Sequence, residues 1–219
     1  MIAKKDALGN YLSFDFHAKD TAGIMNKLCL LWLPRSLRRK IKKELGESWG
    51  NICKLIALLH DIGKITLAFQ NKITLHGSNS DPSLLILPHA KAGEAILEKL
   101  GFHPSFSSII GAHHGVPQDG DILSAFDEAP KAFWGEEKEL WEERWQIIVD
   151  TALHECGFQK PSDLPIISMP MQTLLTGLII MADWLASNQM YFPLLGPTEK
   201  GTLSMYPERI NNAWEKISL

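Results

Sequence analysis

Apolar residues recur along most of the chain at the three- and four-residue spacing of a helix that buries one face. Within residues 52–62 this spacing is carried by Ile52, Leu55, Ile56, Leu59 and Ile62. No segment shows a convincing alternation of apolar and polar residues, which is the pattern of a half-buried strand. The pattern therefore predicts an all-α fold.

Four further helices follow from the same spacing and from the residues that begin and end helices. They are predicted over residues 90–100, 136–156, 171–188 and 206–217. The first two stop at Gly101 and Gly157, and a proline stands at the entry of each of the last two. The segment 171–188 is apolar almost throughout, which is typical of a helix at the buried centre of a domain.

Length and composition are those of an ordinary globular protein, with 219 residues of which 45% are hydrophobic. We expect a single domain over residues 1–219 with its core in residues 17–188, because no long linker interrupts the pattern. Three widely spaced cysteines without a CxxC pair favour a reducing, cytoplasmic location. No membrane span is expected, since the apolar run before Asp183 is too short.

The net charge of −3 gives the protein no global positive field that could hold nucleic acid. A local exception, here called the basic run, consists of Arg35, Arg38, Arg39, Lys40, Lys42 and Lys43. Such a run is most often a solvated helix face, and its functional interpretation is contact with a phosphate backbone. For Arg38 and Arg39 we keep both interpretations.

Candidate chemistry is concentrated in the histidines. His60 and Asp61 are adjacent in the string LLHDIGK, and His113 and His114 are adjacent in GAHHG. Neighbouring residues on a helix diverge by about 100°. His60 and Asp61 therefore cannot point straight at one spot, but they can flank a metal between them, with Asp61 nearer a second ion.

Three more residues extend this set: His17 near the start of the first helix, His89 after a proline, and Asp183 in the apolar string LIIMADWLASN. An ionised aspartate is costly to bury there unless it meets a cation. Each residue alone is usually unremarkable. Together, imidazole and carboxylate groups suit divalent transition metals such as Mn, Fe, Co, Ni or Zn, with ligands enough for two ions. The ordinary settings of His76, His103 and His154 mark them as non-ligands.

The order His17, His60, Asp61 and Asp183 resembles the one-metal core of the HD superfamily of metal-dependent phosphohydrolases. With His89 and the HH doublet added, the chain is similar to a narrower group. That group is the HD nuclease domain of the CRISPR-associated helicase–nuclease of type I systems. The positions of Lys64 in HDIGK and Ser187 in ADWLAS also match its pattern.

The resemblance implies an HD-domain helical bundle around two ions, drawn from Mn, Fe, Co, Ni or Mg. It implies a first ligand set of His17, His60, Asp61 and Asp183, and a second of Asp61, His89, His113 and His114. Asp61 and Lys64 become the expected catalytic residues. Lys64 and Ser187, together with Arg38 and Arg39 of the basic run, become the expected contacts to substrate phosphates.

Single-stranded DNA is the substrate that the resemblance implies, with a helicase domain or subunit and a guide-RNA surveillance complex as partners. The group often continues into a helicase, but the nearest approach to a phosphate loop here, GPTEKGTL, lacks the Gly-Lys-Ser/Thr ending. We therefore expect a stand-alone nuclease subunit or an excised domain.

Two alternatives stay open. The first is an HD phosphohydrolase acting on small nucleotides, against which the HH doublet argues; a cyclic-dinucleotide phosphodiesterase would also need a Gly-Tyr-Pro motif that is missing after HDIGK. The second is a catalytically idle, metal-stabilised domain that docks a partner. Metal-dependent turnover of DNA separates the enzyme from the idle domain.

Overall fold

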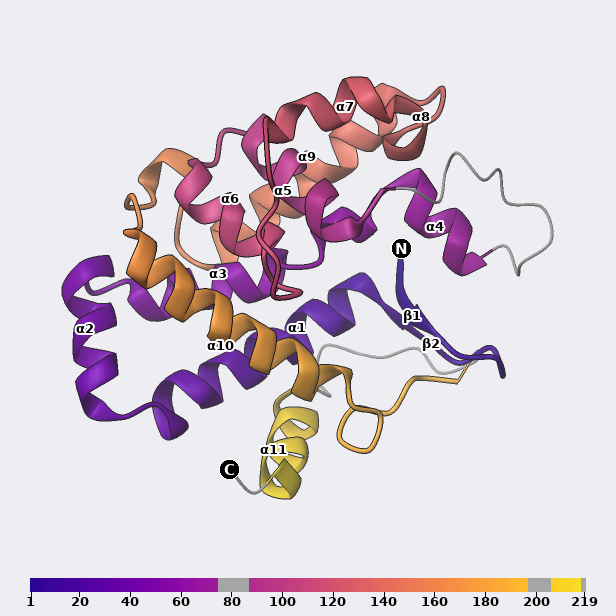
Figure 1. Cartoon of the computed structure of the whole chain (residues 1–219). Coiled ribbons are helices and arrows are strands. Elements are labelled where there is room, and N and C mark those ends of the chain that lie inside the picture. The colour runs from indigo at the N-terminus through magenta and orange to yellow at the C-terminus, as the bar shows by residue number, and fades with distance from the viewer. Residues whose placement is uncertain (75–86, 197–205, 218–219) are drawn as a thin grey trace.

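The computed structural model describes residues 1–74, 87–196 and 206–217, and these are mainly helical (Figure 1). This confirms the predicted all-α class. The elements in chain order are β1 (Ile2–Lys5), β2 (Tyr11–Ser13), α1 (Phe14–Lys27), the π-helix η1 (Leu28–Trp32), α2 (Arg35–Leu45), α3 (Trp49–Leu59), the 3₁₀ turn η2 (Ile62–Lys64), α4 (Leu67–Thr74), α5 (His89–Lys99), α6 (Pro104–Gly111), the 3₁₀ turn η4 (Ile122–Ser124), α7 (Ala125–Glu128), α8 (Pro130–Phe133), α9 (Lys138–Glu155), the 3₁₀ turn η5 (Pro161–Asp163), α10 (Met169–Ser187) and α11 (Tyr206–Ile217).

Helices α5, α9, α10 and α11 lie where the spacing predicts them, within two residues at each end. The helix expected over residues 52–62 differs, because α3 ends at Leu59 and the chain turns into η2. The turn is at Asp61, whose φ of −103° and ψ of 13° leave the helical region. Because the helix ends here, the residues after His60 in the HDIGK motif leave the direction of α3.

The hairpin of β1 and β2 was not expected from the sequence. Its strands are antiparallel, four and three residues long, with a register shift between Ile2 and Lys4. Only Ala3 and Leu12 are buried in them. Strands this short, with one buried residue each, carry too few positions for an alternation to be seen in the sequence.

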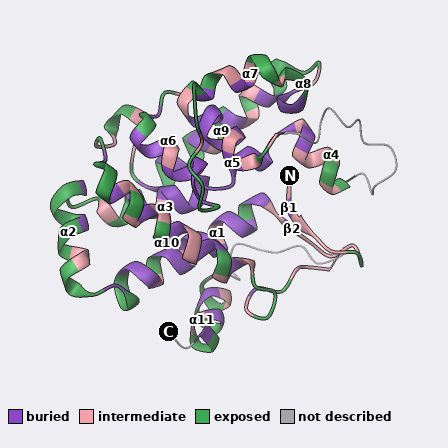
Figure 2. Cartoon of the chain, viewed as in Figure 1, coloured by how far each residue is buried: buried purple, intermediate pink, exposed green. Residues whose placement is uncertain are grey.

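The core lies between α1, α3 and α10, which pack against one another at the centre of the molecule (Figure 1). Their facing sides are buried and their outer sides exposed, as Figure 2 shows for α10. By length and composition, α10 is the one helix of the described residues that could cross a membrane. Its packing against α1 and α6 is instead that of a core helix.

The η2 turn lies directly against α5. A Cβ atom on Gly63 would stand 1.8 Å from the carbonyl oxygen of His89 and 2.6 Å from the amide nitrogen of Gly93. Only glycine permits this approach, because every other residue carries that atom. From the α9 side, the indole Nε1 of Trp145 donates to the carbonyl of Ile65 at 2.5 Å. The loop between α3 and α4 is therefore fixed on two sides.

Glu94 is a buried acid between α5 and α6 with a measurable consequence. The residue is 7% exposed, and among the described residues its Oε2 has no hydrogen-bond partner. Burial, with a smaller contribution from Glu98, raises the pKa of Glu94 from 4.5 to about 7. The pKa of Glu94 is higher in the folded state than in the unfolded state, so the folded state binds the proton more tightly. The stability that the bound proton provides is therefore lost as pH rises from about 4.5 to 7.

We therefore expect Glu94→Gln to raise the melting temperature at pH 8 and to change it little at pH 5. A pKa unit corresponds to about 1.4 kcal/mol, and partial solvent screening reduces the gain at pH 8 to about 1–2 kcal/mol. Thermal denaturation of both proteins at both pH values measures the difference. An equal change at the two pH values would show that ionisation of Glu94 is not what limits stability.

Candidate metal centre

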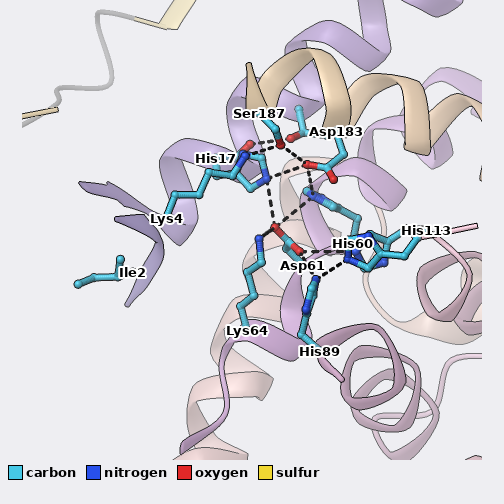
Figure 3. Close-up of polar contacts among 12 residues, drawn as sticks. Ile2, Lys4, His17, His60, Asp61, Lys64, His89, His113, Asp183 and Ser187 are labelled. Carbon is cyan, nitrogen blue, oxygen red and sulfur yellow. Dashed lines mark hydrogen bonds and ion pairs between the residues drawn. The ribbon is translucent and has the colours of Figure 1, made fainter. Parts of the chain in front are cut away.

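Seven side chains from separate parts of the sequence converge at one place in the fold, and Figure 3 labels all of them except His114. Helix ends carry these side chains to the site. The first turns of α1 and α5 lie there, as do the C-terminal ends of α3, α6 and α10. Ser13 caps α1 by accepting from the amide of Phe16 at 3.3 Å, which sets where the helix begins. The residues are His17, His60, Asp61, His89, His113, His114 and Asp183.

The first group contains His17, His60, Asp61 and Asp183, all buried, with ligand atoms within 4.8 Å of one another. The Nε2 of His17 lies 3.1 Å from Oδ2 of Asp61 and 3.0 Å from Oδ1 of Asp183. The Nε2 of His60 lies 3.3 Å and 3.5 Å from the same two oxygens. Two carboxylates and two imidazoles thus enclose one small space.

The second group contains His89, His113 and His114, whose ligand nitrogens also lie within 4.8 Å of one another. The Nε2 atoms of His89 and His114 are 2.8 Å apart. The remaining oxygen of Asp61, Oδ1, lies 3.4 Å from Nε2 of His89 and 3.7 Å from Nε2 of His113. Asp61 therefore presents one oxygen to each group.

Backbone carbonyls orient two of the imidazoles. The Nδ1–H of His60 donates to the carbonyl of Ala57 at 2.7 Å, and that of His113 donates to the carbonyl of Ile110 at 2.6 Å. A carbonyl can only accept, so each neutral ring carries its proton on Nδ1 and its lone pair on Nε2. Metal-binding histidines are held in this way.

Unsatisfied atoms mark the same place. Apart from these close contacts within the cluster, the Nε2 atoms of His17, His60 and His113 and the Oδ1 of Asp61 are buried without a hydrogen-bond partner among the described residues. Most buried polar atoms in folded proteins have a partner, and those left without one are costly. Imidazole nitrogens with carboxylate oxygens are a donor set for divalent transition metals, and a bound cation would satisfy all four atoms. The side chains fit a metal site.

Charge in the site follows from burial and from close partners. Burial alone lowers the pKa of His60, but Asp61 and Asp183 outweigh it and raise that pKa to about 9. Burial lowers the pKa of His113 to about 3, which leaves its ring neutral at pH 7. Burial would raise the pKa of Asp61, yet Lys64 and His60 hold it well below its ordinary value. The carboxylate is therefore ionised.

Lys64 and Ser187 also lie at the site. The Nζ of Lys64, 8% exposed, is 2.5 Å from Oδ2 of Asp61. The hydroxyl of Ser187 donates to Oδ1 of Asp183 at 2.8 Å, as their four-residue separation on α10 predicts. Their contact with a substrate phosphate stays a prediction.

Arg38 and Arg39 lie elsewhere. Their helix, α2, shares a groove with Met171 at the beginning of α10, whereas Asp183 lies near its end. The rise of a helix places about 18 Å between those two levels. Arg38 Nη1 donates to the carbonyl of Leu30 at 2.8 Å, and Arg39 is exposed. The phosphate-contact role of the basic run stays a prediction, at a distance from the metal centre.

The histidines interpreted as non-ligands lie apart from both groups where the structure describes them. His103 caps α6, with its Nδ1 accepting from the amide of Ser105 at 3.1 Å, and His154 is exposed on α9. His76 lies outside the described residues. The sequence analysis missed Lys4, whose ammonium donates to the hydroxyl of Ser187. No motif marks that lysine, because it comes from the unexpected hairpin.

Known proteins resemble this chain over most of its length. The family model described as Cas3, HD domain, matches residues 3–192. A Streptococcus thermophilus protein named CRISPR-associated nuclease/helicase Cas3 is 30% identical over a match that covers 95% of this chain and 26% of the relative. The chain thus spans about a quarter of that relative's length.

Solved structures share the fold. The Thermus thermophilus cas3 HD domain in the presence of Ni²⁺ has a TM-score of 0.68 at 20% identity, covering 98% of this chain and 88% of that one. A chain in a structure of a CRISPR RNA-guided surveillance complex, pre-nicking, has a TM-score of 0.69 at 23% identity, covering 98% of this chain and 28% of that one. The helical fold is therefore common to these chains.

Proposed function

The chain belongs to the Cas3 HD domain family, and from this premise we propose that it is a metal-dependent nuclease for single-stranded DNA in type I CRISPR interference. The observation that carries the proposal is the position of Asp61, with one oxygen toward each of two ligand groups. A carboxylate so placed can bridge two metal ions, which is an arrangement suited to phosphodiester hydrolysis.

In this proposal the first group of residues holds one divalent ion and the second group, with Asp61, holds another. The ions are drawn from Mn, Fe, Co, Ni or Mg. When bound, they supply a water of lowered pKa and polarise the phosphate. The chain itself fixes the ligand directions, through the carbonyls that hold His60 and His113 and through Ser187 on Asp183.

Lys64 is proposed to stabilise the charge that develops on the phosphate. Its side chain is 10% exposed, and its contact with Asp61 keeps the ammonium beside both ligand groups. A fixed cation acts more strongly in such a place than in water, because it needs no reorganisation as negative charge grows.

The partners in this proposal are a helicase domain or subunit and a guide-RNA surveillance complex. They are supported by the nuclease/helicase name of the Streptococcus thermophilus relative and by the structural neighbour in a surveillance complex. A cytoplasmic location is also proposed, supported by Cys29, Cys53 and Cys156, which are all free and buried.

Metal binding should release protons and weaken in acid. Ligation requires a neutral imidazole, and the pKa of His60 near 9 means that its ring is protonated at pH 7 before metal binds. His113, already neutral, contributes no proton. Calorimetric titration with Mn²⁺ or Ni²⁺ at pH 6 and pH 8, in buffers of different ionisation enthalpy, should show tighter binding at pH 8. The absence of any transition-metal binding would contradict the model.

One set of assays tests the proposed activity against several substrates and metal ions. Labelled single-stranded DNA, duplex DNA, RNA and nucleoside triphosphates are each incubated with EDTA, Mg, Mn, Co, Ni or Ca. The proposal requires cleavage of single-stranded DNA that depends on metal. Turnover confined to nucleoside triphosphates would favour the small-nucleotide phosphohydrolase. Metal binding without any turnover would favour the idle docking domain.

A further inference from the structure

A lysine from the hairpin reaches the metal centre beside Ser187, near a different carboxylate from the one that Lys64 contacts. The Nζ of Lys4 donates to the hydroxyl of Ser187, whose own proton goes to Oδ1 of Asp183 (Figure 3). Lys64 contacts Asp61, so the two ammonium groups stand beside different carboxylates of the first ligand group. These five side chains make two short chains of contacts, one ending at Asp183 and the other at Asp61.

One glutamine fixes both lysines relative to each other. The side-chain amide of Gln70, on α4, donates from Nε2 to the carbonyl of Ile2 at 3.0 Å and to that of Lys64 at 2.9 Å. Its Oε1 accepts from the amide of Ile2 at 3.1 Å. The strand that carries Lys4 and the turn that carries Lys64 are thereby joined through a single side chain, which gives the hairpin a fixed place at the site.

The charge of Lys4 is not neutralised in the way that the charge of Lys64 is. Within the described residues its ammonium has a neutral hydroxyl as hydrogen-bond partner and forms no ion pair with a carboxylate. Burial lowers its pKa to about 8 although Asp183 raises it, so the group is mainly charged at pH 7. A half-buried ammonium with two further donors and no direct ion pair among the described residues is suited to an anionic oxygen.

We propose that Lys4 binds a phosphate oxygen of the nucleic-acid strand on the Asp183 side of the metal centre. Ser187 positions the ammonium, and Lys64 acts from the Asp61 side, so that the backbone is held between two lysines. This inference rests on the proposed function and extends it to a residue that no motif marks. The ligand chemistry is that of a phosphodiester oxygen.

The chain offers a matched control in Lys5, the next residue of the same strand. Successive side chains of a strand point to opposite faces, so Lys5 points away from the face that carries Lys4. Lys4→Met and Lys5→Met remove the same charge from the same strand and keep most of the aliphatic stem. Lys4→Arg keeps the charge in place.

The first measurement is binding of a labelled single strand with phosphorothioate linkages, by fluorescence anisotropy in Mn²⁺ over a range of salt concentrations. Lys4→Met should weaken binding about tenfold or more, which is the size expected for a charge-assisted hydrogen bond. It should also flatten the slope of log K against log salt by about 0.7, the share of one contact to a single strand. Lys5→Met should keep the wild-type affinity and slope, and Lys4→Arg should keep most of both.

The second measurement is steady-state cleavage with bound metal content. Lys4→Met should raise KM for the strand far more than it lowers kcat, with unchanged metal per chain. Wild-type affinity and slope in Lys4→Met would overturn the inference. So would a loss confined to kcat or to metal content, because it would make Lys4 a support for Asp183 alone.

The same assays separate this inference from the proposed function. A wild-type protein that binds the strand but does not cleave it contradicts the nuclease proposal, and the salt slope of Lys4→Met still decides the role of Lys4. If the wild-type protein cleaves the strand and Lys4→Met has the same affinity, salt slope, KM and kcat, the inference is contradicted and the proposed function is not. A wild-type protein that neither binds nor cleaves overturns both.

Discussion

Asp61→Ala is expected to abolish cleavage of single-stranded DNA, with a rate loss of more than about 10³-fold. Loss of one electrostatic donor already costs about 10²–10³ in rate, and this change removes more. Its Oδ2 lies near His17 and His60 and its Oδ1 near His89 and His113. Alanine therefore removes an anionic ligand from both groups. Initial rates with saturating metal measure the effect, and circular dichroism checks the fold.

Variants of other residues at the site distinguish a two-metal from a one-metal mechanism by the relative size of their effects. Lys64→Ala should spare metal binding, because an ammonium cannot ligate, and slow turnover by about 10²–10³. His113→Ala and His114→Ala should impair the second group while the first still binds metal. Wild-type activity in Asp61→Ala would refute the two-ion arrangement. Full activity in both histidine variants beside an inactive Asp61→Ala would instead indicate a one-metal site.

Gly63→Ala is expected to damage the second ligand group without altering any ligand. The new Cβ would stand 1.8 Å from the carbonyl oxygen of His89, so η2 and α5 must move apart. Overpacking of this kind costs about 1–3 kcal/mol of stability. The displacement also separates Asp61 from His89. We expect a lower melting temperature and less than the wild-type amount of metal per chain, measured by thermal denaturation and elemental analysis.

The matched control is Gly177→Ala in α10. Nothing lies within 4 Å of a Cβ placed there, and the residue is exposed in a helix. Alanine in such a position leaves stability unchanged or raises it by about 0.4–1 kcal/mol. Normal stability and metal content in Gly63→Ala would mean that the close approach to α5 is not what aligns the two groups.

The sequence predicted what local patterns encode. Helical spacing located α10, and the HD and HH pairs with His17, His89 and Asp183 named the side chains that converge. Two features depend on contacts between distant segments, so no local pattern revealed them. They are the approach of Gly63 to α5 and the hairpin that carries Lys4, whereas the shared position of Asp61 was predicted from the HD pair and the family resemblance.

The basic run shows a different limit. A cluster of like charges predicts a solvated helix face or a phosphate contact, and the sequence does not say how far it lies from the chemistry. That distance is set by the length of α10, which separates Met171 beside α2 from Asp183. A strand reaching Arg39 from the centre would have to follow that helix for most of its length.

The first ligand group joins α1 to the ends of α3 and α10. This connection affects the motions of the protein. Without metal, the last turn of α10 can open as a small local fluctuation. With metal, that opening must also break ligation to α1 and α3, so separate local openings merge into one cooperative unit. Ligand binding stabilises the closed form by RT ln(1 + [L]/Kd). Amide hydrogen exchange should therefore slow together in these three helices, although they lie far apart in the sequence.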